Sequence, residues 1–286
     1  GIVVPEGNSR LGNFFVRFWG VRGSIACPGH DTLRYGGNTS CVEICCDDHL
    51  FIFDGGTGLR EMGKGLSDKG AVDADIFFSH AHLDHIIGIP FLRSIFEPEN
   101  TFRLWAGHLL PDHTLEHVMR AMMTSPLFPV PPDVFSKKVS YHDFKARETL
   151  TPRPGVTLRT APLNHPNGAT GYRLEFDGHT VCYVTDTEHE DGKLDENILE
   201  LIEGADYMIY DCTYTEEEYL QFKGWGHSTW EQGGRLCEAA GVKSLVIFHH
   251  DPAHDDLFMD TLAKEATERY PNCIVAREGM VLRLGE

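Results

Sequence analysis

Short apolar runs bounded by turn residues dominate the first third of the chain. Runs of this length, rich in β-branched and aromatic residues, are typical of β-strands. They occur at residues 14–20, 41–46, 50–54 and 74–80. Helical periodicity then follows at residues 86–95 and 114–123. The pattern predicts a strand-rich start that passes into helices.

The second half repeats this alternation. Strands are predicted at residues 156–163, 171–176, 180–186, 207–211 and 244–250, with helices at 193–205 and 255–270. A further helix should begin at Ser228, because Ser228 and Glu231 fit a capping box, and should end before Gly241. No linker of biased composition separates the halves. We therefore expect a single α/β domain over residues 1–286, a four-layer αββα sandwich of two mixed β-sheets under outer helices.

One segment departs from this regular alternation. Residues 93–136 are rich in Phe, Met and Pro, and the stretch SPLFPVPPD within them disfavours both a helix and a central strand. We expect this segment to be an insertion that forms an apolar lid beside the site or the surface of a homodimer.

Composition narrows the classes of function. With 286 residues, 41% hydrophobic and 24% charged, the chain has the usual globular mix. Asp and Glu outnumber Lys and Arg by 43 to 25, and the net charge of −18 would repel a polyanion, so no extended nucleic acid is expected as a partner. The sequence shows neither a secretory signal pattern nor an apolar run of about 18 residues. We expect no membrane partner and a cytoplasmic location.

The strongest chemical signal is the sequence FFSHAHLDHIIG, which joins a predicted strand to a predicted helix. It places three imidazoles and a carboxylate within six residues, at His80, His82, Asp84 and His85. Nitrogen and oxygen ligands of this kind suit zinc, manganese or iron. Without a metal such a cluster would cost desolvation and repulsion, so a chance grouping in a polar loop is disfavoured.

This H-x-H-x-D-H motif resembles the signature of the metallo-β-lactamase superfamily. The resemblance implies later ligands at strand ends, and APLNHP, CYVTDTEH and SLVIFHHDP offer His165, Asp186 and His249, with His250 left open as the alternative to His249. It further implies that His80, His82 and His165 hold one divalent metal, that Asp84, His85 and His249 hold a second, and that Asp186 bridges them. Zinc is the first choice, with manganese or iron as alternatives.

A second motif, GWGHSTW, places His227 on a loop before a helix. It resembles the G-H-S-T histidine of the phosphodiester-cleaving branch, which includes ribonuclease Z and cyclic phosphodiesterases. The resemblance implies that His227 is a general acid and that Asp211, at the end of the preceding strand, orients it. Asp84 is counted with these two residues among the catalytic groups. The alternative for His227 is that it only packs at the start of a helix. The alternative for Asp211 is that it is a solvated aspartate in a turn.

The N-terminal stretch FWGVRGSIACPGHDTLRYGG combines glycine-rich turns with Arg22 and Arg34, and Arg17 lies just upstream. Gly-rich turns and arginines suit a phosphate, and Arg22 is the leading candidate for a substrate contact. The alternative is that these turns only shape a β-hairpin.

These features together predict a binuclear metal-dependent hydrolase. We expect a phosphodiesterase that cleaves a small phosphodiester, cyclic ones included, with a metal-bridging hydroxide as nucleophile. Nothing resembles the long basic arm of ribonuclease Z, and the cysteine-rich N-terminal zinc site of the phosphonate-pathway phosphodiesterase is also missing. The runner-up is a carboxyl-ester, lactone or thioester hydrolase of the same fold. A third alternative is a non-hydrolytic metal-bound sensor or di-iron redox protein.

Overall fold

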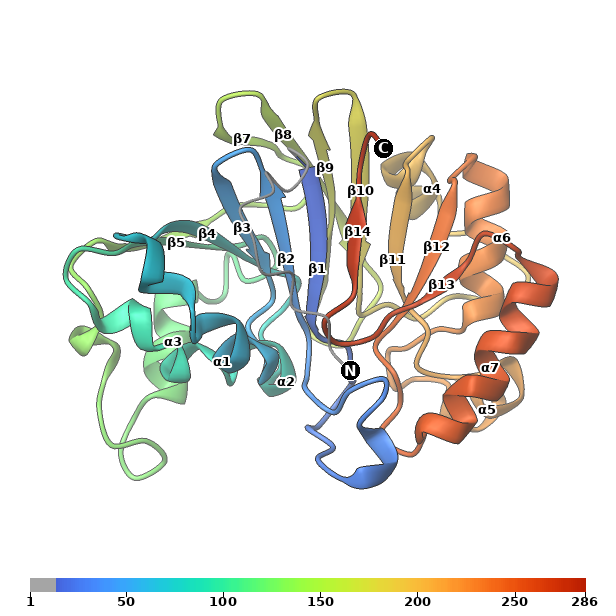
Figure 1. The fold of residues 1–286 in the computed structure, drawn as a ribbon, viewed down its shortest axis with the longest axis horizontal. Helices are drawn as coiled ribbons and strands as arrows, with labels where there is room; N and C mark the ends of the chain where they lie inside the picture. The colour runs from blue at the N-terminus through green and yellow to red at the C-terminus, as the bar shows by residue number, and fades with distance from the viewer. Residues whose placement is uncertain (1–13) are drawn as a thin grey trace.

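Two β-sheets packed face to face form the centre of the molecule, and helices cover the outer face of each (Figure 1). The structure is a computed structural model that describes residues 14–286. Each sheet contains seven strands. This is the predicted αββα sandwich.

The first sheet has the order β14-β1-β2-β3-β4-β5-β6. Strands β3 to β6 are parallel, whereas β14, β1 and β2 are antiparallel to their neighbours. Its strands are β1 (Phe14–Gly20), β2 (Cys41–Cys46), β3 (His49–Phe53), β4 (Asp73–Phe78), β5 (Thr101–Ala106), β6 (Val139–Asp143) and β14 (Val281–Arg283).

The second sheet has the order β13-β12-β11-β10-β9-β8-β7. Strands β10 to β13 are parallel, and β7 to β10 pair in antiparallel fashion. Its strands are β7 (Thr149–Arg153), β8 (Val156–Leu163), β9 (Ala169–Phe176), β10 (His179–Val184), β11 (Tyr207–Asp211), β12 (Ser244–Phe248) and β13 (Ile274–Val275).

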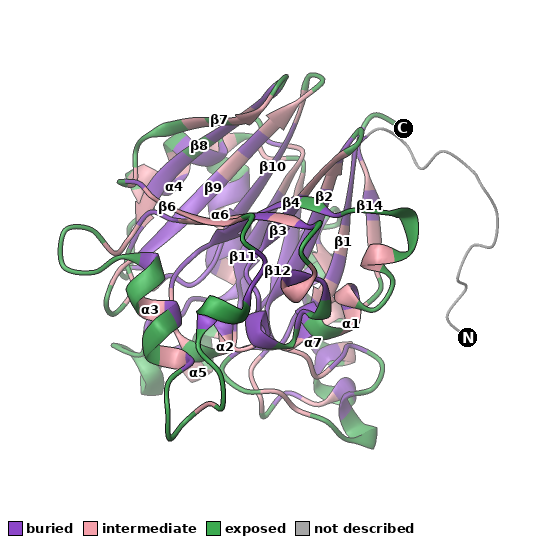
Figure 2. Ribbon diagram, turned by 90° about the vertical axis from the view of Figure 1, so that its left-hand side faces the viewer, coloured by how far each residue is buried: buried purple, intermediate pink, exposed green. Residues whose placement is uncertain are grey.

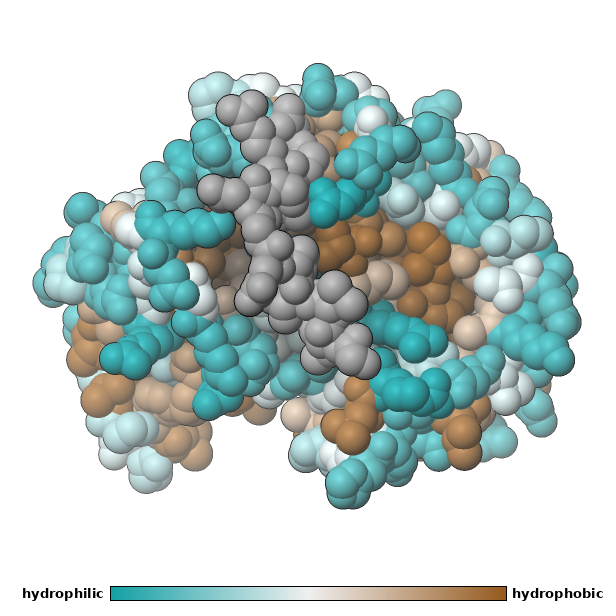
Figure 3. All heavy atoms as spheres, viewed as in Figure 1, coloured by the Kyte–Doolittle hydropathy of each residue, from teal (hydrophilic) through white to brown (hydrophobic). Residues whose placement is uncertain are grey.

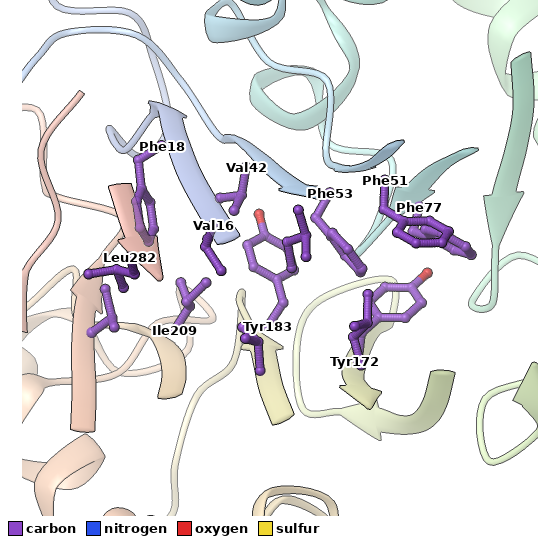
Figure 4. Close-up of a cluster of buried hydrophobic side chains, with 14 of the residues drawn as sticks. Val16, Phe18, Val42, Phe51, Phe53, Phe77, Tyr172, Tyr183, Ile209 and Leu282 are labelled. Carbon is purple, nitrogen blue, oxygen red and sulfur yellow. The ribbon is translucent and has the colours of Figure 1, made fainter. Parts of the chain in front are cut away.

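Three apolar cores separate the four layers. The central core lies between the sheets and joins Phe53 and Phe77 of the first sheet to Tyr172 and Tyr183 of the second (Figure 4). Each outer core packs a sheet against helices. Helices α1 (Gly58–Gly63), α2 (Leu83–Ile86) and α3 (Leu115–Met122) belong to the first sheet's side, and α4 (Glu196–Ile202), α5 (Glu216–Phe222), α6 (Trp230–Ala240) and α7 (Asp256–Arg269) to the second's. Figure 2 shows the buried residues concentrated in the strands and the exposed ones in helices and loops.

Local patterns predicted most strands well, because strands buried on both faces leave long apolar runs in the sequence. The expected helix at 86–95 is wrong: Gly88 and Pro90 divide this stretch into short 3₁₀ turns at Ile89–Phe91 and Arg93–Phe96. The expected cap at Ser228 is also wrong. Thr229 caps α6 by accepting a hydrogen bond from the amide of Gln232, whereas Ser228 is fully buried.

The segment at 93–136 is only partly an insertion. Its first part includes β5, an interior strand paired with β4 and β6, which the apolar core requires. The excursion lies between β5 and β6 and carries α3 and the exposed side chains Leu127 and Val134. Its tip projects from the lower left of the molecule in Figure 1. A lid or interface role for this excursion stays a prediction.

Within residues 14–286, no helix is both long and apolar enough to cross a membrane.

Phe77 should be among the most important side chains for stability. It is fully buried in β4, and its ring lies 5.4 Å from that of Phe53 and 5.7 Å from that of Tyr172 in the other sheet. Because truncation leaves a cavity between the sheets, Phe77→Ala should lower the free energy of unfolding by about 3–5 kcal/mol in a urea titration. Phe91→Ala, at a ring that is 55% exposed, is the control and should cost about 1 kcal/mol or less. Equal losses in the two variants would contradict this account of the core.

Candidate metal centre

The candidate ligands meet at one edge of the two sheets, the lower edge in Figure 1. His80 follows β4, His165 follows β8, Asp186 follows β10 and His249 follows β12. Strands β8, β10 and β12 run in the same direction, so their carboxyl ends reach the same edge. The loops at this edge therefore bring together residues up to about 170 positions apart in the chain.

The candidate ligands form two groups, and within each group the ligand atoms lie within 4.8 Å of one another. A third group of the same kind joins Asp186 and His249 to Asp211 and His227. His80, His82 and His165 make the first group, in which His82 Nδ1 is 3.1 Å from His165 Nε2. Asp84, His85, Asp186 and His249 make the second. There, Asp84 Oδ2 lies 3.2 Å from His85 Nε2 and 3.4 Å from His249 Nε2.

The carboxylate of Asp186 touches both groups. Its Oδ2 atom lies 3.5 Å from His80 Nε2 and 3.7 Å from His165 Nε2 in the first group. The same oxygen is 3.3 Å from His85 Nε2, and Oδ1 is 3.2 Å from His249 Nε2, in the second. This is the position that a shared ligand would occupy.

The residues present fit metal ions. Ligand atoms around a tetrahedral metal with bonds of about 2.0–2.2 Å lie roughly 3.3–3.6 Å apart, close to the spacings found here. The Nε2 atoms of His80, His85 and His249 are buried and have no hydrogen-bond partner. A buried nitrogen without a partner costs free energy, and a metal ion would supply the missing partner.

Every ligand imidazole is fixed through its other ring nitrogen. Nδ1 of His85 donates to Asp54, Nδ1 of His165 donates to the carbonyl of Gly226, and Nδ1 of His249 contacts the Thr213 hydroxyl. His80 Nδ1 contacts Ser79 Oγ, and His82 Nε2 contacts Asn167 Oδ1. Such outer partners set the tautomer and orient the free nitrogen toward a metal.

Asp54 is a functional residue that the sequence analysis missed. Its carboxylate is fully buried and accepts hydrogen bonds from the Ser79 amide and hydroxyl, from His85 Nδ1 and from the hydroxyl of Tyr183. The signal was present in the sequence, since an aspartate directly follows the buried strand β3. The sequence does not show which side chains Asp54 contacts, because its partners follow or belong to other strands.

The two kinds of ligand shift each other's pKa. Burial raises the pKa of Asp84, but the neighbouring imidazoles of His85 and His249 outweigh it and hold that pKa well below its usual range. Burial lowers the pKa of His80, and the adjacent imidazoles lower it further. The cluster therefore favours ionised carboxylates and a neutral His80, the forms that bind metals.

His227 and Asp211 form a pair beside the ligands. His227 Nδ1 lies 2.8 Å from Asp211 Oδ2, and the His227 ring stacks on that of His249 with centroids 5.0 Å apart. Burial lowers the pKa of His227, but the Asp211 carboxylate outweighs it and raises that pKa to about 9. The side chain of His227 stays 11% exposed, so Nε2 is the ring nitrogen left for a substrate.

The two neighbouring histidines after β12 have different roles. His249 lies in the second ligand group, whereas His250 Nε2 donates to the carbonyl of Ala276 at 2.8 Å. Burial lowers the pKa of His250 to about 3. His250 thus fixes the neighbouring loop, and the structure brings only His249 to the cluster.

Arg22 does not lie where a substrate could reach it, which corrects the sequence-based expectation. The side chain is fully buried, and its guanidinium donates to the backbone carbonyls of Gly36, Asp251 and His254. Arg34 pairs with Asp260, and Arg17 lies 3.9 Å from Glu43. Each of the three arginines therefore has its partner within the protein.

The glycine-rich N-terminal stretch packs against two of the candidate ligands, His249 and Asp84. A Cβ on Gly23 would lie 2.5 Å from His249 Nδ1, so only glycine allows the chain to pass this ring. The next residue, Ser24, donates its backbone amide to Asp84 Oδ2. The alternative of turns that only shape the backbone is therefore closer to the structure than a phosphate-binding loop.

His108 is a second residue that the sequence analysis missed. It follows β5, and its ring centroid lies 6.5 Å from that of His80. Its Nδ1 atom is buried and has no hydrogen-bond partner. Burial together with the nearby imidazoles of His82 and His165 lowers the pKa of His108 to about 4. Its neutral ring borders the first ligand group without joining it.

Comparisons with known proteins agree with this fold and site. Residues 49–250 match the family described as the beta-lactamase superfamily domain. The chain is 25% identical over 299 aligned residues to ribonuclease Z of Bacteroides fragilis, covering 88% of this chain and 95% of the relative.

Solved structures show the same fold. The metallo-beta-lactamase fold protein YhfI from Bacillus subtilis superposes with a TM-score of 0.70 at 22% identity, covering 94% of this chain and 99% of that one. The short form of human tRNase Z superposes with a TM-score of 0.66 at 19% identity, covering 95% and 100%. The family match spans both ligand groups and His227. The chain therefore belongs to the beta-lactamase superfamily, as a member with the metallo-β-lactamase fold that lies near the ribonuclease Z branch.

Proposed function

We propose that this protein is a metal-dependent phosphodiesterase that acts on a small phosphodiester. The observation that carries this proposal is the position of His227, which lies beside the ligands and is held there by Asp211. An imidazole outside the two groups of candidate ligands is the kind of side chain that can donate a proton to a poor leaving oxygen. The name of the relative from Bacteroides fragilis supports the same bond type, since a ribonuclease cleaves phosphodiesters.

Two divalent ions fit the ligand set, one in each group, with Asp186 shared between them. The nitrogen-rich set favours zinc, and manganese or iron also suit it. Bound there, such ions lower the pKa of coordinated water and neutralise charge on a phosphoryl group. The protein's own contribution is to hold the imidazoles and carboxylates rigidly and largely out of water.

The proton for the leaving oxygen comes from His227. Asp211 accepts from Nδ1, which leaves Nε2 as the ring nitrogen that can donate a proton to a substrate. Asp211 is itself fixed by the Thr187 amide and by the amide and hydroxyl of Thr213. These hydrogen bonds fix the orientation of the Asp211 carboxylate, which in turn orients His227.

RNA cleavage is the second candidate, and the ribonuclease Z relative favours it. The net charge of −18 opposes it, because a long polyanion would be repelled before reaching the site. A panel of substrates tests these options: bis-p-nitrophenyl phosphate and nucleoside cyclic phosphates, a precursor tRNA, and a p-nitrophenyl ester with a thioester. Turnover of the small phosphodiesters alone supports the proposal, whereas turnover of only the carboxyl substrates would refute it.

Removal of the shared carboxylate should cost metal. The protein should hold about two divalent ions per chain, and Asp186→Ala should lose at least one, because its carboxylate contacts both groups. Elemental analysis after dialysis measures the ratio. Asp191→Ala, at an exposed carboxylate five residues away, is the matched control and should keep both ions. Full occupancy in Asp186→Ala would show that this residue is no bridge.

Loss of the acid should lower turnover and leave metal content unchanged. His227→Ala should keep both ions but lose roughly 10² to 10⁴ in kcat on a phosphodiester with an alkyl leaving group. The loss should shrink with p-nitrophenolate, which needs little protonation to leave. Asp211→Asn should give a smaller loss of kcat of the same kind, because its role is to orient His227.

Steady-state kinetics on the two leaving groups, with metal content measured on the same samples, check this prediction. Unchanged kcat in His227→Ala on the alkyl substrate would remove the acid role. That result would also remove the main reason to prefer a phosphodiester over a carboxyl ester, lactone or thioester as the substrate.

A further inference from the structure

An aromatic cluster adjoins His227 and has no role in the mechanism above. We call Tyr214, Phe222 and Trp225 the aromatic platform. The Tyr214 ring meets His227 edge-on, with centroids 5.8 Å apart, and stacks on Phe222 at 5.0 Å with planes 14° apart. Phe222 in turn meets Trp225 edge-on at 6.3 Å. The three rings therefore form a continuous chain of aromatic contacts that leads away from His227.

Exposure increases along this platform. Tyr214 is 5% exposed, Phe222 37% and Trp225 68%. Burial of a large aromatic side chain normally stabilises a protein, and Trp225 largely lacks this stabilisation because it is exposed. Single exposed apolar residues are common, but here two large exposed rings contact each other, and one of them stacks on Tyr214, which meets His227.

The loop that carries Trp225 is firmly anchored. The amides of Gly224 and Gly226 both donate to Glu188 Oε1, and the carbonyl of Gly226 accepts from the metal-ligand candidate His165. A Cβ on Gly226 would lie 2.4 Å from His165 Nδ1, so the loop packs directly on that ring. Trp225 is thus held at a fixed place, two residues before the acid.

We infer that the aromatic platform is the subsite for a planar base on the leaving-group side of the substrate, which makes the substrate a nucleoside phosphodiester. The inference rests on the proposed function. If His227 protonates the leaving oxygen, the fragment bearing that oxygen extends toward Tyr214 and Trp225. An exposed tryptophan face binds a nucleobase by stacking, without base-specific hydrogen bonds.

The charges around the platform favour a single nucleoside over a longer chain. The carboxylates of Asp211, Glu188 and Glu218 all lie near enough to Tyr214 to raise its pKa, which burial raises first. Lys223, the nearest cation in sequence to Trp225, is paired with Asp191. Acidic surroundings of this kind accept a neutral base and repel a further phosphate.

Substrates with and without a base test the inference. Adenosine 2′,3′-cyclic phosphate and ribose 2′,3′-cyclic phosphate have the same reacting centre, and only the first can stack. Trp225→Ala should raise KM for the adenosine compound by roughly tenfold or more, with little change in kcat, and should leave the ribose compound unaffected. Trp225→Phe should restore most of the loss. Leu220→Ala is the control. Leu220 is an exposed apolar residue of α5 that lines a different cavity, so this variant should leave KM unchanged for both substrates.

Binding gives a readout that does not depend on turnover. AMP should quench the tryptophan fluorescence of the protein in a saturable titration, and ribose 5-phosphate should not. The quench should be lost in Trp225→Phe, which keeps the other three tryptophans. If Trp225→Ala affects both cyclic phosphates equally, or if AMP produces no quench, the inference is wrong while the phosphodiesterase can stand. If neither cyclic phosphate is hydrolysed but AMP still quenches through Trp225, the base subsite holds and the proposed function fails.

Discussion

The whole site depends on buried imidazoles whose inner nitrogens converge on shared carboxylates. Nε2 of His80, His85 and His249 has no protein partner other than the Asp84 and Asp186 oxygens that surround it. This arrangement costs the protein free energy when no cation is bound. The lone pairs of neutral imidazole nitrogens repel carboxylate oxygens, and ionised carboxylates lose their hydration on burial. Cations bound between these groups would relieve both costs, so folding of this edge and metal binding should be linked.

The rigidity that this arrangement needs comes from the packed sheets. Asp54 ends a strand of the first sheet, yet it accepts a hydrogen bond from Tyr183 of the second at 2.7 Å while it orients His85. Tyr172 of the second sheet donates to the carbonyl of Phe78, two residues before His80. These buried bonds join the sheets directly beneath the ligands, so the central core and the site are one structure.

Asp211 connects the acid to the ligands. One of its oxygens accepts from His227, and the other accepts from the hydroxyl of Thr213, which also contacts His249 Nδ1. The imidazole that would hold a metal and the imidazole that would donate a proton are therefore oriented by the same buried carboxylate.

The sequence by itself determined most of the strands, the layered fold and the ligand cluster, because these depend on short-range signals: apolar runs indicate strands, and His80 to His85 lie within six residues. It did not predict strands β5, β6, β7, β13 and β14. His165, Asp186 and His249 could be chosen because each follows a predicted strand in the order that the family resemblance implies. Only the tertiary structure decided the burial and partners of Arg22 and Asp54 and the exposure of Trp225. Arg22 binds backbone carbonyls up to 232 positions away, Asp54 binds Tyr183 across the two sheets, and Trp225 is exposed beside the acid. Burial and partners across such separations are set by how the sheets pack, which no local pattern records.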